Sequence, residues 1–404
     1  MRALFLPDVP HRPSVHAPPR GGASARAPRD APGSAPLKAL TILHLAANRW
    51  WTGSADPTFQ LVRGLRARGH RVLLGVIPGD RFELKAREAG LELIEGLRLS
   101  PGAAAGDTLR LRALLRREGV DLVHAHHSHD HWLALVARPA RPGRGRPPIL
   151  RTFHTLRAVK RDRLAAGLYR RTAGVFAVSR QIEVRCHESG IPPERVFWIP
   201  GAADLPRFEL QADPRPVREE FELGEAPVIV SVARLAPNRG HELLLEGFRL
   251  LLREMPGARL LLVGKGETRA RLEQVVADLG LAKCVVFTGY RDRDLPAVLA
   301  SADCFALMAT GSDDSCRAAL EAMAAARPVV ARGVGALPET VVHGETGLLV
   351  EDDRPESVAA ALAQVLGAPG RGRGMGLAGR QRAQTVFSPE RSVETVERVY
   401  RSLA

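Results

Sequence analysis

The segment Pro227–Gly240 reads PVIVSVARLAPNRG, an apolar run followed by a polar turn that ends in glycine. The run is rich in valine and isoleucine, which predicts a buried strand. Residues 240–254 then carry apolar side chains at helical spacing, and Arg259–Gly264 is a second apolar run. A strand, a helix and a second strand in this order predict a parallel sheet, because parallel strands need a long crossover connection.

The same alternation continues toward the C-terminus, where further helical patterns are separated by short apolar runs. We predict strands at Val285–Gly289, Cys304–Met308 and Pro328–Ala331, and helices at Thr268–Leu279, Leu295–Ser301 and Ser315–Ala325. These elements predict a doubly wound α/β domain over residues 226–375.

An equivalent rhythm occupies the first half of the chain. We predict strands at Leu40–Ala46, Arg71–Ile77, Val120–His124, Ile149–Phe153 and Gly174–Val178, and helices at Phe59–Gly69, Leu109–Gly119 and His131–Arg138. The sequence therefore predicts a second α/β domain over residues 38–205, and two such domains that face each other leave a cleft between their loops.

Three segments lie outside these two domains, and a fourth lies at the end of the second domain. Residues 1–37 mix Pro, Gly, Arg and Ala without periodicity, which predicts a disordered extension. The polar, Pro-rich stretch 206–225 is interpreted as an interdomain linker, and Gly367–Gly376 as a Gly/Arg-rich hinge. Residues 376–404 end in a helical pattern with apolar positions such as Val396 and Tyr400, which we expect to cross back onto the other domain.

The composition indicates a globular protein and argues against a membrane-spanning or disulfide-bonded one. The chain is 45% hydrophobic and 25% charged, a globular balance, and no apolar run is long enough to span a bilayer. Its four cysteines show no CxxC spacing, so neither a disulfide framework nor a zinc site is indicated, and a cytoplasmic protein is expected.

The charge is uneven. Of the net +14, residues 1–215 carry +16 and the remainder −2. Such asymmetry suggests an acidic partner, namely nucleic acid, an anionic membrane surface or a phosphorylated substrate; arginines that merely solvate surface helices are the alternative. Only 5% of residues are aromatic, which disfavours stacking on single-stranded nucleic acid, and we expect no nucleic-acid partner.

In an open α/β sheet, ligands bind at the loops that follow strands. Arg234 and Arg239 flank one such turn before a helix, where paired cations suit a diphosphate; a solvated surface loop is the alternative. Gly264 begins a glycine-rich turn, VGKGE, that permits close approach of a ligand to the backbone.

The strongest candidate is Thr310–Ala325, TGSDDSCRAALEAMAA. Asp313 and Asp314 precede a helix that begins near Ser315, so its unpaired amides point into the cleft. Glu321 falls on an apolar helical face, where a carboxylate needs a partner. Ribose hydroxyls are one such partner. Alternatively, an aspartate only caps the helix and Glu321 pairs with an arginine.

A group of histidines follows the predicted strand VDLVH. The HxH spacing of His124 and His126 can ligate a metal, but no carboxylate or cysteine cluster is near in sequence, and we favour a polar loop that lines the cleft. His154 also ends a strand, and the cations Arg157 and Lys160 follow it. These cations suit a phosphorylated acceptor, or they belong to a solvated helix.

In combination, these motifs resemble the large retaining glycosyltransferase family 4 with the GT-B architecture, over residues 40–404. The family's R-x-x-P-x-K-G is similar to Arg234–Gly240, its V-G-x-G to Val263–Gly266 and its E-x7-E to Asp313–Glu321. Its closing motifs resemble Gly335–Glu339 and Gly344–Val350. DLVHAHHSH, the TFHT around His154 and FSPE…Y also look familial.

The resemblance implies two Rossmann-like domains, a nucleoside diphosphate sugar as donor, a hydroxyl acceptor, retention of anomeric configuration and no metal. It implies that His126, His154 and Asp313 act at the transferred sugar. Donor nucleotide and diphosphate contacts would come from Gly53, Arg234, Arg239, Gly264, Tyr290, Asp314, Ser315, Cys316 and Glu321. Asp313, Arg239 and Gly201 stand where the family usually has Glu, Lys and Asn, which leaves the sugar preference open.

The expected function is sugar transfer in cell-envelope glycolipid, polysaccharide or small-glycoside synthesis. HTLRAVK at residues 154–160 looks like family branches that act on phosphorylated inositol acceptors. The acceptor is therefore expected to be phosphorylated or lipid-linked, and the basic half suits peripheral contact with an anionic membrane at its inner face. Two alternatives remain: a non-catalytic nucleotide-sugar-binding protein and a GT-B nucleotide-sugar epimerase.

Overall fold

The computed structural model describes residues 38–48, 54–139, 145–202, 204–208, 212–309 and 315–404. The extension predicted over residues 1–37 lies outside the described residues. The chain separates into two units, residues 1–38 and residues 39–404, and the description below concerns the second unit.

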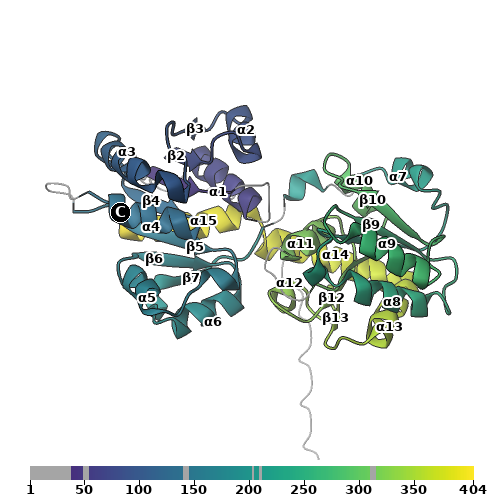
Figure 1. Ribbon diagram of the computed structural model, residues 1–404. Coiled ribbons are helices and arrows are strands. Elements are labelled where there is room, and N and C mark those ends of the chain that lie inside the picture. Colours follow the sequence, from purple (N-terminus) through teal and green to yellow (C-terminus); the bar gives the residue numbers. More distant parts are fainter. Residues whose placement is uncertain (1–37, 49–53, 140–144, 203, 209–211, 310–314) are drawn as a thin grey trace, which may run out of the picture. The chain divides into compact units, whose positions relative to one another are not determined.

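The first sheet consists of parallel strands in the order β3-β2-β1-β4-β5-β6-β7 (Figure 1). Its strands are β1 (Thr41–Ala46), β2 (Arg71–Val76), β3 (Glu92–Leu93), β4 (Leu122–Ala125), β5 (Ile149–Phe153), β6 (Gly174–Ala177) and β7 (Val196–Trp198). Its helices are α1 (Ala55–Ala67), α2 (Arg81–Glu88), α3 (Ala104–Arg117), α4 (Ser128–Ala137), α5 (Arg163–Arg170) and α6 (Arg180–Glu188).

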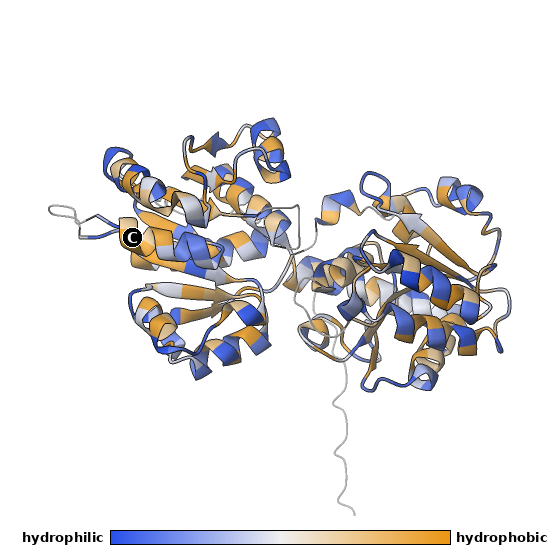
Figure 2. Cartoon of the chain, in the orientation of Figure 1, coloured by the Kyte–Doolittle hydropathy of each residue, from blue (hydrophilic) through white to orange (hydrophobic). Residues whose placement is uncertain are grey.

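The strands are buried because helices cover both faces of the sheet, and the alternation of side chains along β1 shows this. Ile42 packs into the apolar cluster on one face, whereas Leu43 and Leu45 pack into the cluster on the other. Figure 2 agrees with this burial: the strands are coloured mainly as hydrophobic, whereas the surrounding helices carry both hydrophobic and hydrophilic residues.

The second sheet repeats this design with the parallel order β10-β9-β8-β11-β12-β13. Its strands are β8 (Val228–Val232), β9 (Arg259–Val263), β10 (Val285–Gly289), β11 (Cys304–Leu307), β12 (Val329–Arg332) and β13 (Gly347–Val350). Its helices are α8 (His241–Leu251), α9 (Arg269–Asp278), α10 (Leu295–Ala300), α11 (Ser315–Ala324), α12 (Leu337–Thr340) and α13 (Pro355–Leu366). The predicted fold class, two doubly wound parallel α/β sheets, is confirmed.

The segment interpreted as a linker, residues 206–225, is only partly an open connection. It contains helix α7 (Arg215–Glu220), and Phe208, Val217 and Leu223 are buried in a core cluster of the second sheet. The burial of these three residues was not predicted, because the segment is polar overall and its apolar residues are too widely spaced to produce a helical pattern. The domain boundaries remain a prediction.

The predicted hinge Gly367–Gly376 is wrong, because most of it lies in the long helix α14 (Pro369–Val386). Tertiary packing explains one glycine of this helix. A Cβ atom on Gly376 would lie 2.1 Å from the carbonyl oxygen of Ala326, so only glycine lets α14 approach the end of α11 so closely. The helical cost of about 1 kcal/mol for this glycine is offset by this packing.

The last helix, α15 (Pro389–Leu403), packs on the first sheet, as predicted (Figure 1). Val393, Val396 and Tyr400 are buried in the same cluster as Ile42. The C-terminal helix therefore belongs to the core of the first domain, although the second domain precedes it in the chain. Among the described residues, no helix combines the length and the apolar character that a bilayer crossing requires.

Candidate functional site

Two cavities lie at the carboxyl ends of the strands. The large cavity, about 790 Å³, opens beside the last residues of β8 and β9, Val232 and Val263. The small cavity, about 80 Å³, lies where β4 to β7 end, and the residues lining it include His126, His154, Val178 and Ile199. Each of these four closely follows a strand, so the carboxyl edge of the first sheet forms one wall of the small cavity.

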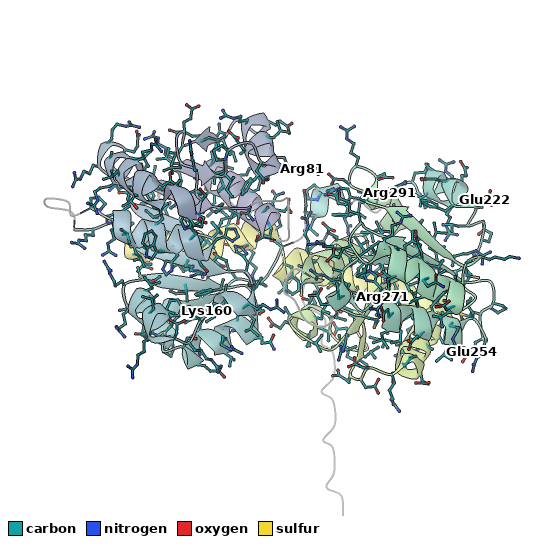
Figure 3. The ribbon with its side chains drawn as sticks, in the orientation of Figure 1. Arg81, Lys160, Glu222, Glu254, Arg271 and Arg291 are labelled. Carbon is teal, nitrogen blue, oxygen red and sulfur yellow. The ribbon has the colours of Figure 1, made fainter. Side chains whose placement is uncertain are left out.

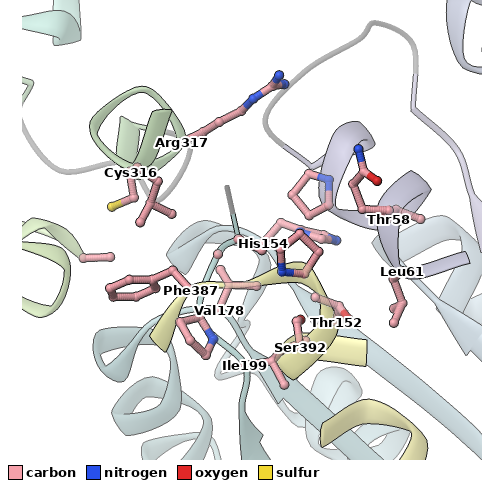
Figure 4. A pocket seen from close by; sticks show the side chains of 18 of the residues that line it. Thr58, Leu61, Thr152, His154, Val178, Ile199, Cys316, Arg317, Phe387 and Ser392 are labelled. Carbon is pink, nitrogen blue, oxygen red and sulfur yellow. The ribbon is translucent and has the colours of Figure 1, made fainter. Parts of the chain in front are cut away.

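The other wall of the small cavity comes from later parts of the chain (Figure 4). Helix α11 contributes Cys316, Arg317 and Leu320, and the junction of α14 and α15 contributes Phe387 and Ser392. Thr58 and Leu61 of α1 also line the small cavity. The lining is therefore mainly apolar, with a few polar groups at its centre.

The large cavity is rich in cations, which are contributed by Arg81, Arg207, Arg234, Lys265, Arg291 and Arg317. Acidic groups pair with part of this charge: Arg234 Nη2 lies 3.0 Å from Glu267 Oε2 and Arg207 Nη2 lies 2.8 Å from Asp292 Oδ1. With six basic and three acidic residues, the lining keeps a net positive charge, which suits a polyanion such as a diphosphate.

Glu321 lies at the floor of the large cavity and is only 6% exposed. Its Oε1 accepts a hydrogen bond from Arg317 Nε at 2.9 Å, and Arg317 Nη2 lies 3.7 Å from Asp56 Oδ2 of α1. Burial raises the pKa of the Glu321 carboxyl, and the positive charge of Arg317 acts in the opposite direction. The structure thus contains the arginine partner that the sequence left open, whereas a ribose contact remains a prediction.

Gly264 is required by packing at this edge. Its φ is +153°, and a Cβ atom there would lie 2.0 Å from the carbonyl oxygen of Ala233. The end of β9 therefore touches the end of β8 directly, and this contact shapes the rim of the large cavity.

The structure brings several predicted site residues together. Arg234, Gly264, Tyr290 and Glu321 line the large cavity, and His126, His154 and Cys316 line the small one. Tyr290 is 49% exposed, and its ring lies 5.4 Å from Lys265 Nζ in a cation–π contact. Their roles in binding or catalysis remain predictions.

Other predicted site residues lie elsewhere. Among the described residues that line either cavity, Arg239, Arg157 and Lys160 do not occur. Arg157 and Lys160 are exposed near the end of β5, and Lys160 is labelled in Figure 3. Gly53, Asp313 and Asp314 lie outside the described residues, and Ser315 is the first residue of α11.

Sequence reasoning missed several cations of the large cavity: Arg81, Arg207, Lys265, Arg291 and Arg317. Arg317 carried a local signal, because it precedes Glu321 by four residues and one helical turn brings such positions together. Lys265 and Arg291 adjoin the predicted site residues Gly264 and Tyr290 in the sequence. Arg81 carried no local signal, since it belongs to α2 of the first domain and only the fold brings it to this cavity.

The histidines of the small cavity lie close together; His126 is buried and His154 is half-buried. His126 Nδ1 lies 3.2 Å from His154 Nε2, and burial lowers the pKa of His154 to about 3. Burial and the neighbouring histidines also lower the pKa of His126 well below its usual value. Both rings are therefore neutral near pH 7. One nitrogen each of His44, His124 and His126 lies within 4.8 Å of the others, a spacing that a metal ion also accepts.

A buried carboxylate supports the loops behind this cavity. Asp130 of α4 is 0% exposed, and its Oδ2 accepts hydrogen bonds from the backbone amides of Ala47 and His127. It thereby ties the end of β1 to the loop that follows β4. Burial raises the pKa of Asp130 to about 7, while these amides and Arg151 act in the opposite direction.

Replacement of Asp130 by asparagine is expected to flatten the pH dependence of stability. The folded-state pKa lies above the ordinary value of 3.8, so the contribution is complete below pH 4 and is lost as the pH rises through 7. A tenfold difference in proton affinity between the folded and unfolded states corresponds to about 1.4 kcal/mol of stability. Urea unfolding of both proteins at pH 5, 6, 7 and 8 measures this effect, and parallel stability curves would contradict it.

The comparisons with known proteins agree with this geometry. Residues 226–368 match the family model described as Glycosyl transferases group 1, and residues 52–207 match that of Glycosyltransferase Family 4. A GDP-mannose-dependent alpha-(1-6)-phosphatidylinositol monomannoside mannosyltransferase of Mycobacterium tuberculosis is 32% identical over 322 residues, which cover 75% of this chain and 81% of the relative.

Two further relatives are similar. The protein of the same description from Mycolicibacterium smegmatis is 36% identical over 214 residues, which cover 51% of this chain and 56% of that protein. A D-inositol 3-phosphate glycosyltransferase of Corynebacterium glutamicum is 30% identical over 293 residues, which cover 66% of this chain and 69% of the relative.

Solved structures share the fold. A glycosyltransferase from Rickettsia africae superposes with a TM-score of 0.81 at 18% identity, covering 90% of this chain and 98% of that one. Anabaena HepE in complex with UDP-glucose superposes with a TM-score of 0.76 at 20% identity, covering 90% and 100%. The two sheets and the returning C-terminal helix define a GT-B enzyme. The chain belongs to glycosyltransferase family 4, the glycosyl transferases group 1, and uses a nucleotide sugar.

Proposed function

We propose that this protein transfers a sugar from a nucleoside diphosphate sugar, bound in the large cavity, to a hydroxyl group of an acceptor at the small cavity, with retention of configuration. The observation that carries the proposal is the position of Arg317, which lines both cavities and pairs with Glu321. A donor whose diphosphate reaches Arg317 would place its sugar between the two cavities.

The large cavity supports the donor half of the proposal. Arg234 and Lys265 at the ends of β8 and β9 supply positive charge for the diphosphate. Glu321 has an acceptor-only carboxylate when ionised, which suits ribose hydroxyls. Tyr290 offers a ring against which a base can stack. We propose that Arg234 and Lys265, with Arg239 and the start of α11, neutralise the charge that develops on the departing diphosphate, so that no metal is needed.

The small cavity and its surroundings support the acceptor half. The relatives named above act on phosphatidylinositol monomannoside or on inositol 3-phosphate, according to their descriptions. We propose an acceptor of this class, a hydroxyl on a phosphorylated or lipid-linked inositol. Arg157 and Lys160 are exposed near the carboxyl edge of the first sheet and would attract its phosphate. The +16 charge of residues 1–215 suits peripheral binding to an anionic membrane.

Within this proposal, His126 and His154 contact the transferred sugar or the acceptor hydroxyl, and Asp313 approaches the donor sugar. Gly53, Asp314, Ser315 and Cys316 are proposed to contact the diphosphate through their backbone amides. GDP-mannose is the first donor to test because two of the named relatives depend on it.

The test is a panel of nucleoside diphosphate sugars, with thermal stability and donor hydrolysis as readouts. We expect one donor to raise the melting temperature and to be turned over, faster when phosphatidylinositol or inositol 3-phosphate is added. A ligand at 100 times its Kd stabilises by about 2.7 kcal/mol. Stabilisation without turnover of any donor, with either acceptor present, would contradict the proposal.

A further inference from the structure

A hydrogen-bonded row of aromatic side chains crosses the face of the first sheet that α15 covers. The parallel register places His44 of β1 beside His124 of β4, and strand alternation returns His126 to the same side. Tyr400 of α15 packs over them: its Oη contacts His124 Nδ1 and lies 3.4 Å from His44 Nε2. This row connects the C-terminal helix to the small cavity.

The row continues at both ends through short contacts. His124 Nε2 lies 2.7 Å from Thr152 Oγ1, and His44 Nδ1 lies 3.0 Å from His126 Nε2. Beyond that, His126 Nδ1 lies 3.2 Å from His154 Nε2. Burial lowers the pKa of His44 and of His154 to about 3, so these rings are neutral. A neutral imidazole has one N–H donor and one bare acceptor nitrogen, so all protons in the row must point the same way.

Thr58 sets the direction. While its hydroxyl donates to the carbonyl oxygen of Ser54 at 2.8 Å, it accepts from His126 Nδ1, which lies 3.1 Å away; turned toward His126, the same hydroxyl would donate to a bare Nδ1 instead. His126 therefore carries its proton on Nδ1, and its Nε2 accepts from His44 Nδ1–H. The remaining donors follow in order: Tyr400 donates to His44, His124 donates to Tyr400, and Thr152 donates to His124.

We propose that Tyr400 and His44 are positioning residues that hold His126 and His154 in the tautomers protonated at Nδ1. The Nδ1–H of His126 is then shared between Thr58 Oγ1 and His154 Nε2, so His154 Nε2 is an acceptor and the one proton of His154 is on Nδ1. His154, which lines the small cavity, offers a hydrogen-bond donor to an oxygen of the bound sugar or acceptor and does not remove a proton from it. This last step rests on the proposed function.

The tautomers can be measured without any activity. The full chain, labelled with 15N-histidine, is examined by long-range 1H–15N correlation, and His126→Gln and His154→Gln assign the two signals. We expect protonated Nδ1 and bare Nε2 for both rings. In Tyr400→Phe, which lacks only the hydroxyl, His44 Nε2 loses its donor, so the reversed row, with Thr58 turned to donate to His126 Nδ1 and His126 protonated at Nε2, should appear as well. His44→Gln cuts the row at another link and should give the same change.

A matched control separates the hydrogen bonds from the packing of α15. Val399 is buried in α15 and lies outside the row, so Val399→Ala loosens the same helix and should leave both tautomers unchanged. An Nε2-protonated His126 in the wild-type protein, or an unchanged tautomer in Tyr400→Phe, would overturn the proposal. Stoichiometric metal in the purified protein, lost in His44→Gln, would also overturn it, because the three rings would then be ligands.

Kinetics tests the functional step. With the donor and acceptor identified, Tyr400→Phe should lower kcat about tenfold and change the donor KM less than about twofold, since the donor binds in the other cavity. Val399→Ala should change both less than about twofold. Equal kinetic losses in the two variants would overturn the functional step. Failure of the wild-type protein to turn over any donor would contradict the proposed function and leave the tautomer result standing.

Discussion

Replacing Arg317 by methionine is expected to lower kcat/KM for the nucleotide sugar about 100-fold or more, the loss typical of one preorganised charge-stabilising donor. Arg317 is the cation common to the linings of both cavities, and its guanidinium is the partner of the buried Glu321 carboxylate. Methionine retains most of the volume and the apolar stem but supplies no positive charge. Steady-state kinetics with the donor found in the panel measures the loss.

A control variant and a double mutant separate the causes of this loss. Arg271 of α9 pairs with Glu242 at the surface and is 71% exposed, so Arg271→Met should leave turnover within about twofold of wild type. In Arg317→Met the buried Glu321 loses its partner, which also destabilises the protein. Adding Glu321→Gln should restore stability, which identifies the unpaired carboxylate as the cause of the destabilisation. Turnover within about threefold of wild type in Arg317→Met would contradict the role of Arg317.

Replacing Glu397 by alanine is expected to destabilise the protein by about 3 kcal/mol, because a buried ion-pair partner is removed. Glu397 of α15 is 5% exposed; it accepts hydrogen bonds from His70 Nε2 at 3.1 Å and from Arg401 Nη2 at 2.6 Å, and it contacts Arg68. His70 and Arg68 follow α1, so this cluster fastens the C-terminal helix to the first domain. Urea unfolding at pH 7 measures the change.

We expect the contribution of Glu397 to stability to change with pH in the opposite direction to that of Asp130. Hydrogen bonds from Arg401, His70 and Arg68 outweigh the effect of burial and lower the pKa of Glu397 to about 2, from 4.5. Its contribution is therefore present above pH 4.5 and is lost as the pH falls toward 2. The difference between wild type and Glu397→Ala should shrink over this range.

The matched control for Glu397 is Glu394, which lies on the same helix. Its Oε1 is 4.0 Å from Arg398 Nη2, and both side chains are more than half exposed. Glu394→Ala should cost less than about 0.5 kcal/mol at any pH. Equal losses for the two variants would show that helix propensity, not the buried cluster, is responsible.

Detaching α15 from the first domain, unlike the loss of one packing contact in Val399→Ala, should also affect the site, because Ser392 and Val393 of this helix line the small cavity. The stability of the C-terminal helix and the shape of the proposed acceptor pocket are thus physically linked. The last helix of the chain therefore both packs in the core of the first domain and lines the small cavity.

The sequence by itself determined the fold class and the places where a site can lie. Apolar runs such as Val228–Val232 alternate with amphipathic helices, and this alternation is local, because burial on both faces of a parallel sheet demands it. The loops after these strands were therefore predictable as site loops, and Glu321 stood out because a carboxylate on an apolar face requires a partner.

Only the tertiary structure decided which distant groups meet. The register between β1 and β4 sets His44 beside His124, α15 adds Tyr400 to them, and α11 directs Arg317 to both cavities. It also makes a helix of the Gly-rich segment whose composition predicts a hinge, because α14 packs against Ala326. Local periodicity reports which face of an element is buried. It contains no information about which other element covers that face, since contacts between residues hundreds of positions apart arise only when the sheets and helices pack.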